Sequence, residues 1–383
     1  MSGKSLSRSI GRNLGKAAPI DPWIPVLTAL LVGIGLVMIY SASAPRSLSN
    51  YGSFWHFASR QGIWAGIGML ALLVGMKFDY KHWEKLAAPL LLLTMAALVV
   101  TLIPGIGLSA GGARRWLGVG GFTIQPSEAA KFACAVYMAS YLAHHGHDLK
   151  RGATVLRPLI LVGIVLLLIV VEPDLGNAVA ISAVAGSLLF MAGIGWRFIL
   201  PLILTAVLGL SAAIIAEPYR LTRLTSYLDP WADPHGTGFQ VIQSFLAFGS
   251  GGIAGLGLGE GRQKLFFLPE PHTDFIFAVI GEELGLIGAL LVVGLFAAFA
   301  WRGVRIARHC PDVFGQYLAL ALTLMVTIQA LINMGVTVGA LPNKGLPLPF
   351  ISYGGSSLLL NLFAVGVLIN ISRKRPSLAV GKG

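Results

Sequence analysis

Charged side chains are scarce in this sequence. Only 11% of its 383 residues are Asp, Glu, Lys or Arg, whereas 55% are hydrophobic. An ordinary soluble protein of this length needs more charge on its surface, so that class is excluded. Apolar runs of about 20 residues, which cross a bilayer core of about 30 Å, recur along the chain instead. The composition therefore predicts a polytopic helical membrane protein.

Cysteine is almost absent as well. The two cysteines, Cys134 in a hydrophobic segment and Cys310 in a basic loop, lack the spacing of metal ligands, so we predict neither a disulfide nor a metal site from them. The net charge of +12 could suggest nucleic-acid binding, but the basic residues are spread over short loops and both tails. Attraction to the membrane surface explains such scattered charge more simply, and no nucleic-acid partner is expected.

The hydrophobic pattern predicts an all-α polytopic integral membrane protein with about ten transmembrane helices. Residues 1–20 form an N-terminal tail, 21–373 the membrane domain and 374–383 a C-terminal tail. The first apolar run lacks a small-residue cleavage site, which indicates a retained helix. Loops on the side of the two tails carry about twice as much Lys and Arg as the opposite loops, so both termini are predicted to be cytoplasmic. The predicted spans are 22–42, 61–78, 86–104, 126–144, 155–172, 175–194, 197–216, 274–301, 315–338 and 354–372.

This orientation places a long extracytoplasmic loop, residues 217–273, between the seventh and eighth spans. Loops this long are usually functional. It begins with a turn-rich stretch in which Asp229 and Asp233 each precede a proline, and it continues into a glycine-rich stretch. The glycines of 255–259 superficially resemble a phosphate-binding loop, but no strand precedes them and no Gly-Lys-Ser/Thr follows, so no nucleotide is expected. We expect a re-entrant or membrane-surface helix within this loop.

Three carboxylates, Asp274, Glu282 and Glu283, lie at or inside the predicted eighth span. A charge at the bilayer centre costs about 2.5–3.5 kcal/mol even on insertion scales, so such groups face a bundle interior or a cavity. In one continuous helix, Asp274 shares a small, acidic face with Glu282, and the two glutamates lie about 12 Å deeper than Asp274. Thr273 would cap this helix. The alternative is that Asp274 only caps the helix and complements its dipole.

Further charged residues gather on the predicted outer half of the bundle. Glu128 and Lys131 are spaced i, i+3 in the fourth span, where an intrahelical ion pair is favoured over a direct catalytic role. Glu172 and Asp174 lie in a tight turn between the fifth and sixth spans, at the outer mouth of the bundle. Prolines and glycines interrupt the apolar segment 341–357, so its backbone must pack into the bundle or line a cavity.

Basic residues on the same outer half would suit an anionic ligand, such as a lipid with a phosphate or pyrophosphate headgroup. Contact with ordinary anionic lipids or with neighbouring carboxylates is the alternative for each of them. The candidates are Arg114, Arg115, Arg223, Arg262, Lys264 and Lys344.

Several motifs follow one another along nearly the whole membrane domain. They are Gly112-Ala-Arg-Arg-Trp116, Gln125-Pro-Ser-Glu128, Glu172-Pro-Asp174, Leu228-Asp-Pro230, Gly249-Ser-Gly-Gly252, His272-Thr-Asp-Phe-Ile-Phe-Ala278 and Pro347-Leu-Pro-Phe-Ile-Ser-Tyr-Gly-Gly-Ser356. Taken together, they resemble the SEDS family of shape, elongation, division and sporulation proteins. The segments that begin at Leu228 and Lys344 are more similar to the cell-division branch than to the elongation branch, although Asn343 stands where the division branch usually has threonine.

This resemblance implies a peptidoglycan glycosyltransferase that polymerises lipid II at the outer face of the cytoplasmic membrane, at the division septum. It also implies a class B penicillin-binding protein as transpeptidase partner, together with other divisome membrane proteins. Carried over by motif, Asp274 is the essential carboxylate. Glu128 and Lys131 would support the central cavity. Glu172 and Asp174 belong to a further motif that is important in the family.

The implied reaction transfers a sugar from an undecaprenyl-pyrophosphate donor to the 4-hydroxyl of an acceptor sugar. It needs a base near that hydroxyl and positive charge near the departing pyrophosphate. We hypothesise that Asp274 deprotonates or orients the acceptor, while the basic candidates, with a divalent cation such as Mg²⁺ or Mn²⁺, stabilise the leaving group. His272 and Ser352 fall in matching motifs and are further candidates for the substrate cavity. Three alternatives stay open: a lipid II flippase, a noncatalytic scaffold that recruits a penicillin-binding protein, and a polymerase of the elongation branch. A transporter is expected to carry charges along a pathway through both leaflets, whereas the charges here gather on the outer half apart from Glu282 and Glu283.

Overall fold

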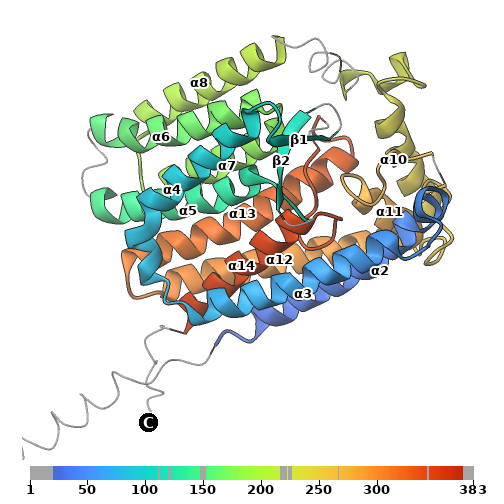
Figure 1. Cartoon of the computed structure of the whole chain (residues 1–383), viewed down its shortest axis with the longest axis horizontal. Coiled ribbons are helices and arrows are strands. Elements are labelled where there is room, and N and C mark those ends of the chain that lie inside the picture. Colours follow the sequence, from blue (N-terminus) through green and yellow to red (C-terminus); the bar gives the residue numbers. More distant parts are fainter. Residues whose placement is uncertain are drawn as a thin grey trace, which may run out of the picture.

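The computed structural model describes residues 20–110, 113–119, 122–146, 152–215, 222, 227–265, 267–342 and 345–373. Apart from residue 20, both predicted tails lie outside this part of the chain. Long helices run side by side along the molecule and form one bundle (Figure 1). The helices are α2 (Trp23–Tyr51), α3 (His56–Lys77), α4 (Lys81–Leu102), α5 (Pro126–His145), α6 (Gly152–Val171), α7 (Leu175–Met191), α8 (Trp196–Ile215), α10 (Phe239–Gly251), α11 (Ile276–Glu283), α12 (Gly285–His309), α13 (Val313–Thr337) and α14 (Gly355–Ser372).

The positions of the long helices agree with the predicted spans. Within the described residues, seven helices are long and apolar enough to cross a membrane: α2, α3, α4, α6, α12, α13 and α14. The other predicted spans correspond to α5, which Glu128 and Lys131 make more polar, to α7, which has 17 residues, and to α8. The predicted helical membrane architecture is therefore confirmed.

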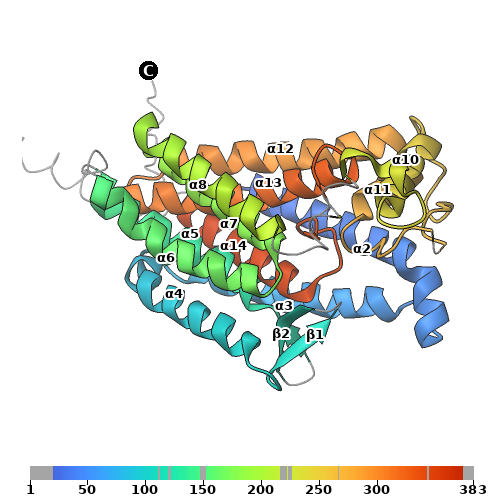
Figure 2. The ribbon, with the colours of Figure 1, turned by 90° about the horizontal axis from the view of Figure 1, so that it is seen from above.

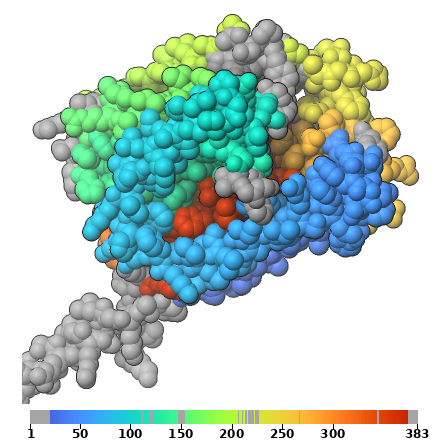
Figure 3. Space-filling model, viewed as in Figure 1, coloured from blue at the N-terminus to red at the C-terminus, as the bar shows by residue number. Residues whose placement is uncertain are grey.

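Helices α13 and α14 form the centre of the bundle. In the most apolar 18-residue stretch of each helix, 72% of the residues of α13 and 78% of those of α14 are buried, whereas only 17% are buried in α3. Glycines bring α3 and α14 together: a Cβ built on Gly75 would lie 2.7 Å from the Phe363 carbonyl oxygen, and one built on Gly366 would collide with the backbone of Leu72. Such close backbone contact is typical of membrane helices. Figure 3 shows the red C-terminal part of the chain at the floor of a recess between α3 and α4.

A small antiparallel sheet connects α4 to α5. Its strands are β1 (Gly107–Ala110), β2 (Ala113–Val119) and β3 (Phe122–Ile124), with β2 in the middle. The register pairs Leu117 of β2 with Gly107 on one side and with Ile124 on the other. The expectation of a purely helical protein missed this sheet, because the periodicity of such short strands is weak beside the long apolar runs. The sheet contacts α4 and α5 and carries Arg114 and Arg115.

The predicted eighth span is wrong at its start, because two helices replace one. α11 ends at Glu283, and α12 begins at Gly285, whose φ of +67° is unfavourable for any residue with a side chain. Asp274 precedes α11, and Thr273 does not cap it, since the Thr273 hydroxyl donates to the Glu270 carbonyl. Asp274 and Glu282 therefore do not share one helical face, and the predicted difference in depth between Asp274 and the two glutamates loses its basis.

The long outer loop packs against α11 through its backbone. It contains a short 3₁₀ turn, η2 (Pro230–Ala232), and α10, which confirms a helix within this loop. After α10, the amides of Leu256 and Gly257 donate to the carbonyls of Glu282 and Glu283, each at 3.0 Å. A Cβ built on Gly255 would collide with the backbone of Glu283. The glycine-rich stretch therefore serves close packing, and α10 and α11 lie together at one end of the bundle (Figures 1 and 2).

Candidate active site

The segment that contains Asp274 is fixed by side chains from two other elements. Asn333, near the end of α13, donates through Nδ2 to the Asp274 carbonyl at 2.8 Å and to the Leu346 carbonyl at 2.7 Å. An amide nitrogen carries two hydrogens, so this one side chain joins two loop segments. Ser352 donates to the Thr273 carbonyl at 2.6 Å. The residues before α11 and the segment before α14 are therefore tied to each other and to α13.

The carboxylate of Asp274 lies beside Gly345. A Cβ built on Gly345 would lie 3.3 Å from Asp274 Oδ2, and the φ of Gly345 is +60°. A larger residue would be strained in its own backbone and would press on the carboxylate. Glycine thus brings the backbone that precedes α14 directly against the half-buried Asp274 side chain.

The ion pair predicted in the fourth span is confirmed. Lys131 Nζ lies 2.9 Å from a Glu128 carboxylate oxygen, and the two side chains are 3% and 2% exposed. Lys131 also donates to Gln329 Oε1 at 2.5 Å, and Gln329 Nε2 donates to the Pro347 carbonyl at 2.8 Å. Buried charges need such partners to offset their desolvation. The resulting polar network ends on the same segment that lies against Asp274.

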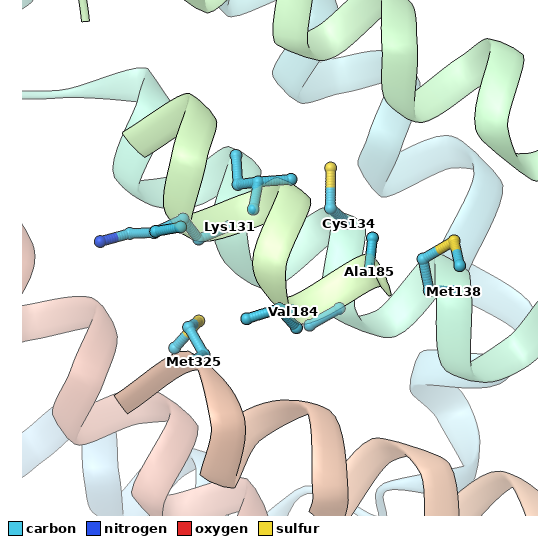
Figure 4. Close-up of a pocket in the computed structure, with 9 residues that line it drawn as sticks. Lys131, Cys134, Met138, Val184, Ala185 and Met325 are labelled. Carbon is cyan, nitrogen blue, oxygen red and sulfur yellow. The ribbon is translucent and has the colours of Figure 1, made fainter. Parts of the chain in front are cut away.

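The Lys131 ammonium belongs to this network and not to the apolar cavity next to it. That cavity lies between α5, α7 and α13, and its volume of about 10 Å³ has room for about one water molecule. Figure 4 shows the Lys131 nitrogen directed away from Cys134 and Met138, which line the cavity. The cavity is too small and too apolar to hold a sugar.

Glu172 and Asp174 lie in the predicted turn between α6 and α7, and both are buried, at 1% and 3% exposure. Asp174 is the N-cap of α7, where it accepts from the Asn177 amide at 3.2 Å, and it also accepts from the Ser127 hydroxyl at 2.9 Å. Glu172 accepts a hydrogen bond from the Thr101 hydroxyl. Burial raises the pKa of Glu172 to about 7. These contacts join the turn between α6 and α7 to α4 and α5.

The basic candidates on β2 differ in exposure. Arg115 is committed to the turn before α7: its Nε donates to the Glu172 carbonyl at 3.0 Å, and its guanidinium also donates to the Pro173 carbonyl. Arg114 is exposed, as is Arg262 in the long loop. Two further candidates lie outside the described residues, namely Arg223 and Lys344.

Lys264 forms a buried ion pair, which argues against its predicted role in pyrophosphate binding. Its side chain is 6% exposed, and Nζ lies 2.7 Å from Glu283 Oε1. It also donates to Ser41 Oγ at 3.0 Å and to the Gly259 carbonyl at 2.6 Å. An ammonium has three hydrogens, so these acceptors use all of them. Glu283 and Lys264 thereby attach the long loop to α2 and α11.

His272 is buried among aromatic rings. It is 2% exposed, and its ring centroid lies 4.5 Å from that of Phe57 and 5.6 Å from that of Tyr353. Burial lowers the pKa of His272 to about 4, and the charge of Arg46 acts in the same direction. The imidazole is therefore neutral near pH 7 and supplies no charge for a phosphate. The His272 carbonyl accepts from the Tyr353 amide at 2.9 Å, which further fixes the segment.

Comparison with known proteins agrees with the motifs. The family model of the cell cycle proteins FtsW, RodA and SpoVE matches residues 22–377, nearly the whole described bundle. The chain belongs to this family. The resemblance stated from the sequence is therefore confirmed.

Individual relatives match this FtsW/RodA/SpoVE family member over nearly their full length. It is 46% identical over 363 residues to the probable peptidoglycan glycosyltransferase FtsW of Geobacter metallireducens, which covers 94% of this chain and 97% of that protein. It is 44% identical over 361 residues to stage V sporulation protein E of Bacillus subtilis, with 94% and 98% covered. The fold also matches a chain in a solved structure of a peptidoglycan synthase complex, which is described as showing structural coordination of polymerization and crosslinking. The TM-score is 0.78 and the sequence identity is 30%, and the match covers 93% of this chain and 98% of that one.

Two residues that organise the candidate site of this family member lie outside the motifs and were not predicted from the sequence. Gln329 and Asn333 stand at i and i+4 on α13, so both face the same side of the helix. Both are buried, at 0% and 2% exposure. A pair of amides at helical spacing in an apolar span is itself a sign of an interior polar contact, and that signal could have found them.

The described residues do not form a resident metal site. They contain no group of three or more His, Cys, Asp or Glu that could hold a metal ion. Mg²⁺ requires near-octahedral oxygen coordination and is often bound by one or two carboxylates together with substrate phosphates. The divalent cation expected from the sequence stays a prediction.

Proposed function

We propose that this chain is a peptidoglycan glycosyltransferase that polymerises lipid II at the outer face of the cytoplasmic membrane, in septal wall synthesis during cell division. Membership of the family and high similarity to a relative named as an FtsW glycosyltransferase support this activity. The structural match to a chain of a peptidoglycan synthase complex supports it as well. One observation carries the choice of site: Asp274 presents a half-buried carboxylate from a segment whose backbone Asn333 and Ser352 hold in place.

Asp274 acts on the acceptor sugar. Its carboxylate takes the proton of the 4-hydroxyl while that oxygen bonds to C1 of the donor. The bond from C1 to undecaprenyl pyrophosphate breaks, and the pyrophosphate leaves with the bonding electrons. Such a base works only if it is held in the right geometry. Asn333 and Ser352 bond to backbone carbonyls, so they position Asp274 without occupying its carboxylate oxygens.

Positive charge at the departing pyrophosphate comes from exposed arginines in this proposal. Arg114 on β2 and Arg262 in the long loop are exposed candidates, whereas Lys264 is fully engaged in its ion pair. A guanidinium can bind phosphate oxygens in a bidentate manner, which stabilises the developing charge. Mg²⁺ or Mn²⁺ would add to this stabilisation if it arrives bound to the pyrophosphate oxygens.

The proposed orientation places both termini in the cytoplasm, on the side of the bundle richer in Lys and Arg. The sheet, the long loop and Asp274 then lie toward the outer face, where the sugar and the pyrophosphate of lipid II are accessible. A class B penicillin-binding protein is the proposed partner, since the structural relative belongs to a complex that coordinates polymerization and crosslinking. Other divisome membrane proteins would complete the assembly at the septum.

Polymerisation of labelled lipid II by the purified chain, alone and with its penicillin-binding partner, tests the proposal. Asp274→Asn keeps the size of the side chain but removes the base. Since general base catalysis contributes about 10²–10⁴-fold, we expect glycan strands to form at least about 100-fold more slowly. Glu260→Gln, which neutralises an exposed carboxylate of the long loop, is the matched control and should retain the wild-type rate.

Different outcomes reject different parts of the proposal. Full activity of Asp274→Asn would remove Asp274 from the reaction. No strands from the wild-type complex, with lipid II crossing liposome membranes instead, would indicate a flippase. Midcell enrichment of a fluorescent fusion supports the division role, whereas patches along the cylinder would assign the chain to elongation.

A further inference from the structure

A second cavity lies at the opposite end of α5 from Glu128. It forms where α4 begins and α5 ends, and its volume is about 170 Å³. At a rise of 1.5 Å per residue, its lining residue His144 lies about 24 Å along α5 from Glu128, so the cavity is separate from the candidate active site. It is far larger than the cavity beside Lys131, which has room for about one water molecule.

The helix backbone orients two imidazoles of the cavity lining. His144 Nδ1 bonds to the Ser140 carbonyl at 2.9 Å, and His145 Nδ1 bonds to the Tyr141 carbonyl at 3.1 Å. A carbonyl only accepts, so each Nδ1 carries a hydrogen, and each Nε2 is the nitrogen left for contacts beyond α5. His144 Nε2 lies 3.7 Å from a carboxylate oxygen of Glu84. The two imidazoles therefore face the cavity side of the helix as polar groups.

Two cations of the described residues lie at or beside the cavity. Lys85 lines it and is exposed. The Tyr141 hydroxyl donates to the Thr154 carbonyl at 2.8 Å, which places the start of α6 beside the cavity, and Arg157 of α6 lies within electrostatic reach of Tyr141. Among the described residues that line the cavity, Glu84 alone carries a carboxylate, and it lies against His144. An anion in the cavity would therefore meet the charges of Lys85 and Arg157 against the carboxylate of Glu84.

The wall toward the middle of α4 is apolar. Ala87 and Ala88 line the cavity there, and Leu92 and Leu93, about one turn further along, are 59% and 67% exposed. Because α4 is long and apolar enough to span the bilayer, such exposed leucines face lipid chains. A molecule with an anionic head and acyl chains would place its head beside Lys85 and its chains along this face of α4.

We propose that this cavity binds a phosphate-bearing anion, with the headgroup of an anionic phospholipid as its source. Basic pockets between transmembrane helices recognise such headgroups. Lys85 and Arg157 supply the positive charge, and the imidazole of His145 supplies a polar contact. A free phosphate compound shares the headgroup chemistry but makes no use of the exposed leucines, so the apolar wall favours the lipid.

Native mass spectrometry of the full chain tests this proposal. The chain is released from nanodiscs of phosphatidylcholine, with and without phosphatidylglycerol. We expect one retained phosphatidylglycerol per chain, and we expect Lys85→Gln to weaken its affinity about tenfold, since it removes a charge-assisted contact. Glu84→Gln should strengthen binding, because it removes the carboxylate of the lining. Lys81→Gln, one turn earlier on α4 and outside the lining, is the matched control and should change nothing.

Equal retention by the wild type, Lys85→Gln and Glu84→Gln would overturn the proposal. The same loss in Lys81→Gln would overturn it too, because it would indicate general attraction to the helix end. A second arm adds inorganic phosphate to the chain in phosphatidylcholine nanodiscs and measures thermal unfolding. Protection that depends on Lys85 supports the phosphate site and assigns it to a soluble ligand, whereas lipid retention without phosphate protection supports the site and assigns it to the lipid.

Discussion

Breaking the buried ion pair between Lys264 and Glu283 should destabilise the outer end of the bundle. The two side chains are 6% and 0% exposed, and the distance between Nζ and Oε1 is 2.7 Å. Lys264→Met keeps most of the aliphatic length but removes all three donors. The Glu283 carboxylate would then stay buried, and among the described residues the Ser41 hydroxyl and the Gly259 amide would remain as its partners. Removing one member of a buried pair costs about 3–5 kcal/mol, so we expect a loss of this size.

An exposed ion pair of the same region gives the comparison. Arg46 Nη1 lies 3.1 Å from a Glu270 carboxylate oxygen, and the side chains are 25% and 58% exposed. Glu270→Gln should therefore cost only about 0–1 kcal/mol. Adding Glu283→Gln to Lys264→Met should recover part of the larger loss, because no uncompensated charge then remains buried.

The free energy of unfolding can be measured in mixed micelles with a rising fraction of sodium dodecyl sulfate, followed by the fluorescence of the eight tryptophans. We expect a large loss of unfolding free energy for Lys264→Met, a small loss for Glu270→Gln and partial recovery in the double variant. If Lys264→Met were no less stable than Glu270→Gln, the buried pair would not be what holds the long loop to α2 and α11.

Three further predictions follow from single contacts. Asn333→Ala should slow lipid II polymerisation by about tenfold or more at saturating substrate, because the Asp274 carbonyl loses its donor; an unchanged rate would contradict the positioning role. Gly285→Ala should destabilise the chain by about 1–3 kcal/mol in thermal unfolding, because of its φ of +67° and a collision with the backbone of the long loop. Gly294→Ala, whose added Cβ meets nothing within 4 Å, is its control and should be nearly neutral. Burial raises the pKa of Glu172 to about 7 from an ordinary value near 4.5, so the folded state binds this proton more tightly than the unfolded chain does. The stability of the fold should therefore decrease as the pH rises from about 4.5 to about 7. Melting temperatures measured between pH 5 and pH 8 test this prediction. If the melting temperature of Glu172→Gln changed with pH as much as that of the wild type, another group would be responsible.

The membrane class, the family and the span positions, except the start of the eighth span, could be predicted from the sequence. In lipid, a helix satisfies every backbone group within its own segment, so a run of about 20 apolar residues predicts a span without knowledge of its neighbours. The ion pair between Glu128 and Lys131 was predictable for the same reason, because both partners lie on one helix. The motif around Asp274 indicated the candidate base, since a carboxylate at a span is costly unless it has a role.

Only the tertiary structure decided which distant groups meet. The sequence pattern favoured one helix through Gly285, whereas contact with the glycine-rich stretch of the long loop requires a break there. The sequence predicted that Lys264 binds phosphate, whereas in the structure its ammonium contacts Ser41 and Glu283. Asn333 carried no motif, yet it joins the Asp274 segment to the segment before α14. Periodicity reports which face of an element is apolar, but it holds no information about the partner that covers that face.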